Sequence, residues 1–166
     1  MDAMENKKQT QELLGHGLRY AFSLSHHQAQ AEDLLQSAWL AIFKANGPLN
    51  KAYLFKTIRN LFINQYRRNT LAPMVPLDDF SEEGPDMGQQ QHLDNVESDL
   101  DAVGTAMESL RAIEREAMYL FAVEGYTADE IAELLDTTRG TVLSLIHRSR
   151  KKIKTRLSQM EYKVMS

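Results

Sequence analysis

Apolar side chains recur along much of the chain every three or four residues, which is the spacing that predicts α-helices. Between residues 31 and 46 they form one broad stripe, made of Leu34, Leu35, Ala38, Trp39, Ile42 and Phe43. We expect this segment to be an amphipathic helix that ends at Gly47 and Pro48. Regular alternation of β-branched residues, the pattern of strands, is absent from these periodic segments. The pattern therefore predicts an all-α protein.

A second amphipathic helix is predicted after the short loop, over residues 51–69. Its apolar face consists of Leu54, Ile58, Leu61, Phe62 and Gln65. The opposite face presents Lys56, Arg59, Asn60, Ile63 and Arg67, with Tyr53 and Asn64 at its edge. A basic face that also carries an aromatic ring and amides is typical of phosphate contacts combined with base contacts. A basic face that is merely solvated remains an alternative.

The stretch "YTADEIAELLDTTRGTVLSLIHRSRKKIKTRL", from Tyr126 to Leu157, contains two helix starts in quick succession. Thr127 and Glu130 have the spacing of a capping box, so a short helix begins at Ala128. The polar turn "DTT" follows, and Thr138 is placed to cap a second helix. Two helices separated by about three residues, the first of them short, predict a helix-turn-helix.

The second helix of this pair has two distinct faces. Its apolar stripe runs through Val142, Leu145, Ile146, Ser149, Ile153 and Leu157. The other face carries Gly140, Ser144, His147, Arg148, Lys151 and Lys154. Arg139, Ser144 and His147 lie at the end that reaches base edges in a recognition helix, and the later cations would meet phosphates. The alternative is a helical hairpin whose cations favour only the helix dipole.

Charge is segregated along the chain, although the formal net charge is only −4. Residues 34–77 contain no acid, residues 69–110 contain no Lys or Arg, and residues 139–156 carry seven Lys and Arg with no acid. The acidic middle also holds three of the four prolines. We therefore expect two small helical lobes, residues 1–70 and 102–166, joined by an acidic flexible linker over residues 71–101.

Several classes of protein are disfavoured by composition. The chain has no Cys, and no apolar run approaches the roughly 20 residues that span a bilayer. The N-terminus lacks the apolar core of a signal peptide. The five His show no ligand spacing, and the carboxylates gather in the linker, where no pocket would tune them for catalysis. We expect a soluble cytoplasmic protein without metal, cofactor, enzymatic activity or membrane insertion.

Three stretches resemble one family, the extracytoplasmic-function (ECF) class of bacterial sigma factors. "ESLRAIEREAMYLFAVEGYTADEIAELLDTTRGTVLSLIHRSRKKI" is similar to sigma region four. "QAEDLLQSAWLAIFKA" and "AYLFKTIRNLFINQYRR" are similar to the parts of region two that bind the polymerase clamp and the minus-ten element. The resemblance implies a region two helical bundle and a region four helix-turn-helix. It also implies a subunit that binds core RNA polymerase, recognises both promoter elements and directs transcription initiation.

The resemblance assigns roles to particular residues. Asp33, Leu34 and Gln36 match positions that touch the clamp helices of the largest polymerase subunit, whereas Trp39 and Phe43 are left to the core. A surface around Leu110, Leu120 and Phe121 would meet the flap of the second subunit. The predicted DNA contacts are Lys56, Arg59, Asn60, Asn64, Arg67 and Arg68 in region two, and Arg139, Gly140, Thr141, Ser144, His147, Arg148 and Lys151 in region four. Specificity is expected from Arg139 to Ser144, with phosphate anchors from His147 onward.

The chain departs from the family pattern at several places. The loop between Ala45 and Tyr53 is several residues shorter than usual in the segment that captures a flipped minus-ten base. Tyr53 replaces the usual Trp, and Ser37 stands where an acid is common. Two other classes remain open: a stand-alone helix-turn-helix regulator, and a helical adaptor that leaves DNA alone. Core RNA polymerase and promoter DNA are the implied partners, and an anti-sigma factor is a further candidate.

Overall fold

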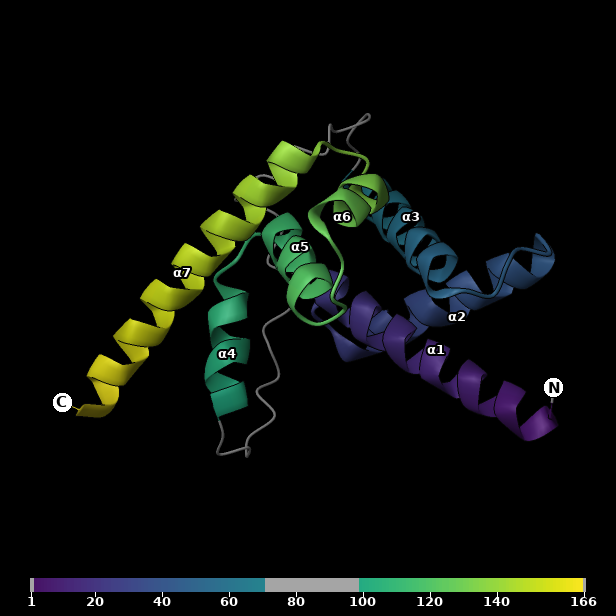
Figure 1. The fold of residues 1–166 in the computed structure, drawn as a ribbon, viewed down its shortest axis with the longest axis horizontal. Coiled ribbons are helices and arrows are strands. Elements are labelled where there is room, and N and C mark those ends of the chain that lie inside the picture. Colours follow the sequence, from purple (N-terminus) through teal and green to yellow (C-terminus); the bar gives the residue numbers. More distant parts are fainter. Residues whose placement is uncertain (1, 71–98, 166) are drawn as a thin grey trace. The chain divides into compact units, whose positions relative to one another are not determined.

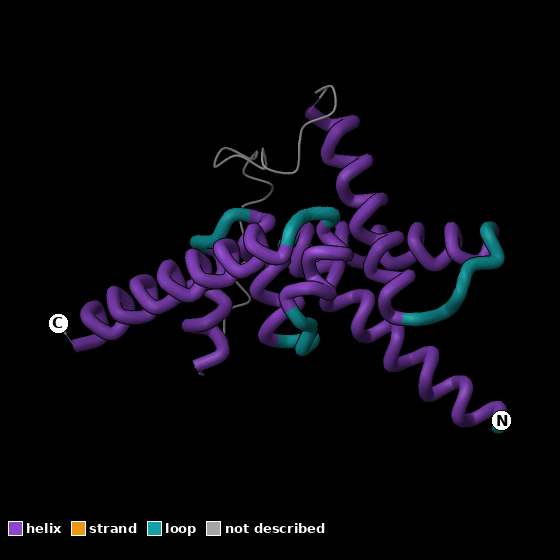
Figure 2. The backbone as a smooth tube through the Cα atoms, turned by 45° about the horizontal axis from the view of Figure 1, so that its top comes forward, coloured by secondary structure: helices purple, strands orange, loops and turns teal. Residues whose placement is uncertain are grey.

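The computed structural model describes residues 2–70 and 99–165, so most of the predicted linker lies outside the described residues. Within these ranges every regular element is an α-helix, which confirms the all-α prediction (Figure 2). The chain forms two compact units, Met1–Asp79 and Phe80–Ser166, which we call the N-terminal lobe and the C-terminal lobe. The lobe boundaries expected at residues 70 and 102 stay predictions.

The N-terminal lobe is a bundle of three helices, α1 (Ala3–Ser25), α2 (Gln28–Lys44) and α3 (Lys51–Thr70), each packed against the other two (Figure 1). Its core is centred on Tyr20 and Phe55, which are both fully buried and whose rings stack with centroids 4.3 Å apart. Stacked aromatic pairs add to the stabilisation that comes from burial alone. Around this pair lie the buried side chains of Ala21, Leu24, Ala31, Leu34, Ala38, Ile42, Leu54 and Ile58.

Backbone features explain how α1 joins α2 so closely. His26 ends α1 in the left-handed conformation with φ 54°, and the Nδ1 atom of His27 accepts the Gln30 N–H at 3.4 Å at the start of α2. The two histidines thus lie at helix ends, His26 after α1 and His27 before α2. Gly17 lies where a Cβ would stand 2.7 Å from Leu35 Cδ1 and 2.9 Å from Leu54 Cδ2. The missing side chain at Gly17 allows α1 to approach both neighbouring helices.

The C-terminal lobe consists of α4 (Asp99–Glu108), α5 (Ala112–Ala122), α6 (Ala128–Leu135) and α7 (Arg139–Met165). The long helix α7 packs against all three others, so it is the central helix of this lobe (Figure 1). The shared core includes the buried side chains of Ala117, Leu120, Ile131, Leu135, Val142, Leu145 and Ile146. Helix α7 contacts every other helix of the lobe on its inner side. Its rotation about its own axis therefore determines which of its residues face solvent.

A buried carboxylate ties α5 to α7. The Glu114 side chain is 1% exposed, and Lys152 Nζ donates to its two oxygens at 3.1 and 2.9 Å. The N–H and Nε of Arg111 donate to the same carboxylate at 3.1 and 3.2 Å. Ser149 Oγ, also buried, donates to the Glu114 carbonyl at 3.3 Å and to the Leu145 carbonyl at 2.6 Å. The charge of Glu114 is therefore paired as well as hydrogen-bonded, which a buried carboxylate requires.

These contacts also set the ionisation of Glu114. Burial raises the pKa of its carboxyl, but the hydrogen bond from Lys152, the Arg111 N–H and the charges of both basic side chains outweigh burial. The net result is a pKa below that of an ordinary glutamate. A carboxyl whose pKa is lower in the folded than in the unfolded state stabilises the fold above its unfolded-state pKa. That stabilisation is lost as the pH falls through the folded-state value.

We predict that Glu114→Gln destabilises the C-terminal lobe at neutral pH by about 1 to 3 kcal/mol, the range for hydrogen bonds to charged groups. Hydrogen exchange of the α5 and α7 amides should quicken at pH 7. The difference between variant and wild type should shrink as the pH falls through the lowered pKa of Glu114, below the ordinary range of a glutamate, because the wild-type carboxyl then becomes protonated. Glu133→Gln, on the exposed side of α6, is the matched control and should leave exchange unchanged. Equal hydrogen exchange in the Glu114→Gln and Glu133→Gln variants at pH 7 would contradict a stabilising pair between Glu114 and Lys152.

We predict that Phe55→Ala destabilises the N-terminal lobe by about 3 to 5 kcal/mol, because it leaves a cavity against Tyr20. Trp39 is the single tryptophan of the chain and lies on α2, so its fluorescence during urea unfolding reports on this lobe. Leu40→Ala on the same helix is a suitable control, since Leu40 is 58% exposed, and should change stability by less than about 0.5 kcal/mol. A shared unfolding midpoint for the two variants would rule out the aromatic core.

Candidate nucleic-acid interface

The helix-turn-helix begins with the predicted capping box. Glu130 N–H donates to Thr127 Oγ1 at 3.2 Å, and Thr127 N–H donates to Glu130 Oε2 at 2.8 Å. Helix α6 ends at Asp136, which takes the left-handed conformation with φ 54°. Thr141 N–H then donates to Thr138 Oγ1 at 3.2 Å at the start of α7. Both predicted caps are confirmed, and the turn between the helices is correspondingly short.

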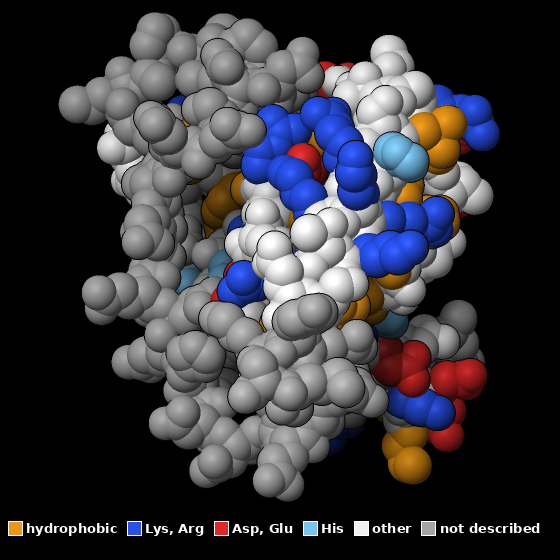
Figure 3. All heavy atoms as spheres, turned by 90° about the vertical axis from the view of Figure 1, so that its left-hand side faces the viewer, with side chains coloured by type: hydrophobic (Ala, Val, Ile, Leu, Met, Phe, Trp, Pro, Cys, Tyr) orange, Lys and Arg blue, Asp and Glu red, His pale blue; other side chains and the backbone are white. Residues whose placement is uncertain are grey.

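Helix α7 separates its side chains as the spacing predicted. The inward residues Val142, Leu145, Ile146 and Ser149 are buried. The outward residues are all exposed: Gly140, Ser144, His147, Arg148, Lys151 and Lys154. Figure 3 shows Lys and Arg side chains gathered on one face, with a histidine beside them. This face combines small polar groups near the helix start with positive charge further along, so it can offer hydrogen bonds to bases and charge to phosphates.

Among the predicted DNA contacts, Arg139 and Thr141 lie beside polar side chains of the same lobe. Arg139 Nε lies 3.7 Å from Asp129 Oδ1, and both side chains are largely exposed. Such an exposed pair contributes little to stability, so the guanidinium is available to a stronger partner. The Thr141 hydroxyl lies 3.0 Å from the Thr138 hydroxyl and is half-buried. Thr141 therefore takes part in the helix start, and its hydroxyl is less available than that of Ser144.

Gly140 stands in the first turn of α7 with open space where a side chain would project. A Cβ built at this position would have no atom within 4 Å. Packing inside the lobe therefore does not require glycine here, and helix propensity disfavours it. The bare backbone instead leaves the N-terminal end of α7 accessible to a close approach from outside.

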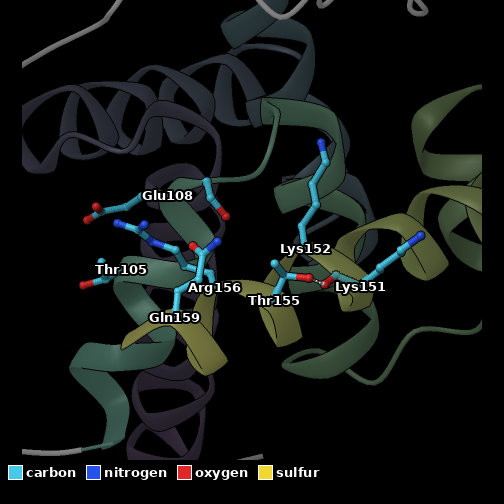
Figure 4. Close-up of a pocket in the computed structure, with 8 residues that line it drawn as sticks. Thr105, Glu108, Lys151, Lys152, Thr155, Arg156 and Gln159 are labelled. Atoms are coloured by element: carbon cyan, nitrogen blue, oxygen red, sulfur yellow. Dashed lines mark hydrogen bonds between the residues drawn. The ribbon is translucent and has the colours of Figure 1, made fainter. Parts of the chain in front are cut away.

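A groove of about 650 Å³ runs between α4 and α7 of the C-terminal lobe. Figure 4 shows Thr105 and Glu108 on the α4 side, with Lys151, Lys152, Thr155, Arg156 and Gln159 along α7. Thr155 Oγ1 donates to the Lys151 carbonyl at 2.9 Å, a bond within the helix. The positive charge of α7 thus continues past the outward face into this groove, opposed by Glu108.

On α3 the structure confirms part of the predicted face and corrects one residue. Lys56, Asn60, Asn64 and Arg68 are exposed, and Arg67 is half-buried. Arg59, expected on the same exposed face, is only 4% exposed. The prediction that it faces solvent is wrong because α3 packs against both α1 and α2, which widens its buried arc to include Leu54, Phe55, Ile58 and Arg59. Its guanidinium is not accessible to a DNA phosphate in this conformation.

On α2 the predicted polymerase contacts divide between surface and core. Asp33 and Gln36 are exposed, but Leu34 is fully buried, so its assignment as a direct contact is wrong. It is buried because Ala31, Leu34, Ala38 and Ile42 form the stripe that faces α1 and α3. A binding partner therefore cannot contact the Leu34 side chain directly while the lobe is folded.

The outward side of α2 is more apolar than expected. Phe43, assigned to the core from its periodicity, is 57% exposed, and its ring meets the half-buried Trp39 edge-on with centroids 5.7 Å apart. Leu40, which had no assigned role, is 58% exposed. Leu40 lies seven residues, or two helical turns, after Asp33. This spacing in the sequence could have placed Leu40 on the same exposed face as Asp33. Asp33, Gln36, Leu40 and Phe43 together form what we call the α2 outer face.

The apolar surface predicted around Leu110, Leu120 and Phe121 is largely internal. Leu110 is 5% exposed and Leu120 is fully buried, so neither can meet a partner directly. Phe121 is half-buried under the Arg150 guanidinium, which lies 5.1 Å from the ring centroid in a cation–π contact. These residues turn inward because α5 packs on both α6 and α7. The exposed apolar residue at this end of α5 is Val123, at 61%.

Two family models match the chain, Sigma-70 region 2 over residues 11–71 and Sigma-70 region 4 over residues 100–153. The chain is similar to the ECF RNA polymerase sigma factor SigE of Mycolicibacterium smegmatis, with 32% identity over 149 residues. That match covers 85% of this chain but only 57% of SigE. The chain is also similar to the ECF RNA polymerase sigma factor EcfG of Rhodopseudomonas palustris, with 28% identity. That match covers 81% of this chain and 75% of EcfG.

A solved structure supports the same relationship. The sigma factor RpoE of Bartonella quintana, crystallised with the anti-sigma factor NepR, matches with a TM-score of 0.72 and 26% identity. The match covers 93% of this chain and 97% of that one. In the ranges that the structure describes, none of the helices is long and apolar enough to cross a membrane. The order of the two regions and their relatives show that the chain belongs to the sigma-70 family, within its extracytoplasmic-function class.

Proposed function

We propose that this chain is a promoter-specificity subunit of RNA polymerase, which binds core polymerase, recognises two promoter elements and directs transcription initiation. The observation that carries the proposal is the combination of the α2 outer face in one lobe with the exposed polar and cationic face of α7 in the other. The relatives named as ECF RNA polymerase sigma factors support it. The protein acts in the bacterial cytoplasm, contributes binding rather than catalysis, and needs no cofactor.

The C-terminal lobe reads the minus-thirty-five element in this proposal. Arg139, Gly140 and Ser144 lie at the end of α7 that enters the major groove, and Thr141 borders them. His147, Arg148 and Lys151 follow one and two turns later, where a recognition helix leaves the bases and meets phosphates. Contacts with phosphates supply affinity that does not depend on sequence and that falls with salt.

The N-terminal lobe engages the minus-ten element through the exposed residues of α3. Lys56 and Arg68 offer charge to phosphates, and Asn60 and Asn64 offer amides that can both donate and accept. Arg67 lies at the edge of this surface. Arg59 supports the lobe from inside rather than touching the duplex, since its side chain is buried.

The α2 outer face is the proposed site for the clamp helices of the largest polymerase subunit. Asp33 and Gln36 supply polar groups, while Leu40 and Phe43 supply apolar area, a mixture typical of interfaces. The flap of the second subunit is then met near Val123, the large exposed apolar residue directly after α5. The solved RpoE structure is a complex with NepR, which supports an anti-sigma factor as an additional partner of this chain.

A stand-alone regulator is the competing function, and it predicts tight unaided binding to a palindrome. The decisive experiment mixes the chain with core RNA polymerase and asks whether a stable complex starts transcription at one promoter. We expect both complex formation and promoter-specific initiation. No binding to core polymerase, together with tight unaided binding to a palindromic site, would favour the regulator instead.

We predict that changing Asp33 and Gln36 together to Ala lowers the affinity for core polymerase about tenfold, equivalent to about 1.4 kcal/mol. Both side chains are exposed, so urea unfolding followed by Trp39 fluorescence should be unaffected. Leu34→Ala gives the opposite pattern, a loss of about 2 to 5 kcal/mol in stability, because its side chain is fully buried. Unchanged polymerase affinity in the double variant would reject the α2 outer face as the clamp site.

We predict that Arg148→Ala weakens promoter binding by the polymerase complex to a similar extent on all upstream sequences and lowers the magnitude of the salt slope by about one. Ser144→Ala should instead change which bases are preferred in the minus-thirty-five element, with a smaller effect on overall affinity. Binding to a panel of promoter variants at several salt concentrations separates the two effects. Identical base preferences in wild type and the Ser144 variant would show that the helix is docked in another orientation.

A further inference from the structure

Leu143 is the large apolar residue on the otherwise polar surface at the start of α7. Its side chain is 43% exposed, whereas Val142, Leu145 and Ile146 are all buried in the lobe's core. It therefore contributes little to holding α7 in place. Its neighbours along the outward face are Gly140, one turn earlier, and Ser144, which are both exposed.

The local geometry leaves Leu143 open toward the helix start. In an α-helix the Cα–Cβ bond tilts toward the N-terminus, so the side chain of residue 143 lies over the turn formed by Arg139 and Gly140. Gly140 has no side chain, and the space where one would stand contains no atom within 4 Å. Leu143 therefore has no side chain beside it at position 140, one turn earlier in the helix.

A single exposed leucine is common on protein surfaces and carries no meaning by itself. The position of Leu143 makes its exposure informative, because the first turns of a recognition helix reach the base edges of the major groove. The major-groove edges there are hydrogen-bond donors and acceptors, with one apolar group, the C5-methyl of thymine. A leucine pressed against any other edge would leave a polar group of the base without a partner, which is unfavourable.

We propose that Leu143 contacts the C5-methyl of a thymine in the upstream promoter element, and so selects an A·T pair at that position. The proposal rests on the function assigned above, in which α7 enters the major groove. Ser144 and Arg139 read neighbouring bases by hydrogen bonds, and Leu143 adds selection by shape and apolar contact. Gly140 allows this contact because its bare backbone lets the helix start lie close to the bases.

The test uses the full chain assembled with core RNA polymerase. The upstream element is first selected from random sequence, and each thymine in it, on either strand, is then replaced singly by deoxyuridine. This replacement removes the methyl group and leaves the hydrogen-bonding groups unchanged. The wild type should lose about fourfold in promoter binding at one position, the factor expected for one buried methyl group. Leu143→Ala should lose less than twofold there, and Leu143→Met should retain most of the wild-type discrimination.

The controls separate this inference from the function on which it rests. Leu143 is exposed, so the Ala variant should unfold as the wild type does and should bind core polymerase equally well. A polymerase complex that initiates specifically, yet shows no effect of deoxyuridine or the same effect in the Ala variant, overturns the role of Leu143 alone. A selected element without thymine overturns it as well. Absence of a functional complex with core polymerase overturns the proposed function and this inference together.

Discussion

The rotation of α7 about its own axis is constrained by one charge pair, between the buried Glu114 carboxylate and the partly exposed Lys152. Glu114, at the start of α5, receives Lys152 from a position 38 residues later, and Ser149 is bonded to the backbone of the same glutamate. Because successive helical residues are about 100° apart, a rotation by one residue would turn part of the apolar stripe of α7 outward and part of its polar face inward. The pair and the packed stripe beneath it therefore decide that Ser144 and Arg148 point outward. An apolar core alone fixes a helix less uniquely than a core with a charged pair at a single position.

In the N-terminal lobe, aromatic packing and one close helix approach position the helices. The stacked rings of Tyr20 and Phe55 join α1 to α3, and the absence of a side chain at Gly17 lets α1 lie close to both other helices. Burying Leu34 then leaves Asp33 and Gln36 on the outside of α2. The two lobes thus have separate cores. A substitution that weakens one core should leave the surface of the other intact.

Local chemistry was predictable from the sequence, and long-range packing was not. The caps at Thr127 and Thr138 and the two faces of α7 followed from residues within one or two helical turns of each other. Arg59, Leu34 and Phe43 were misplaced because their burial depends on how many helices pack against α2 and α3, which periodicity does not reveal. The Glu114 and Lys152 pair was also invisible, since nothing in the local pattern distinguishes it from many other acids and bases.

If α7 binds DNA as proposed, the contact between Arg139 and Asp129 gives base recognition and overall affinity different responses to ionic strength. Added salt weakens every contact between α7 and phosphates, so total affinity falls. The same salt screens the exposed pair that holds Arg139 back over α6, which lowers the cost of moving its guanidinium toward a base. As the salt concentration rises, the sequence-specific part of the affinity that Arg139 contributes should therefore decline more slowly than the non-specific part. In the proposed function, discrimination between promoters would therefore depend less on ionic strength than promoter occupancy does.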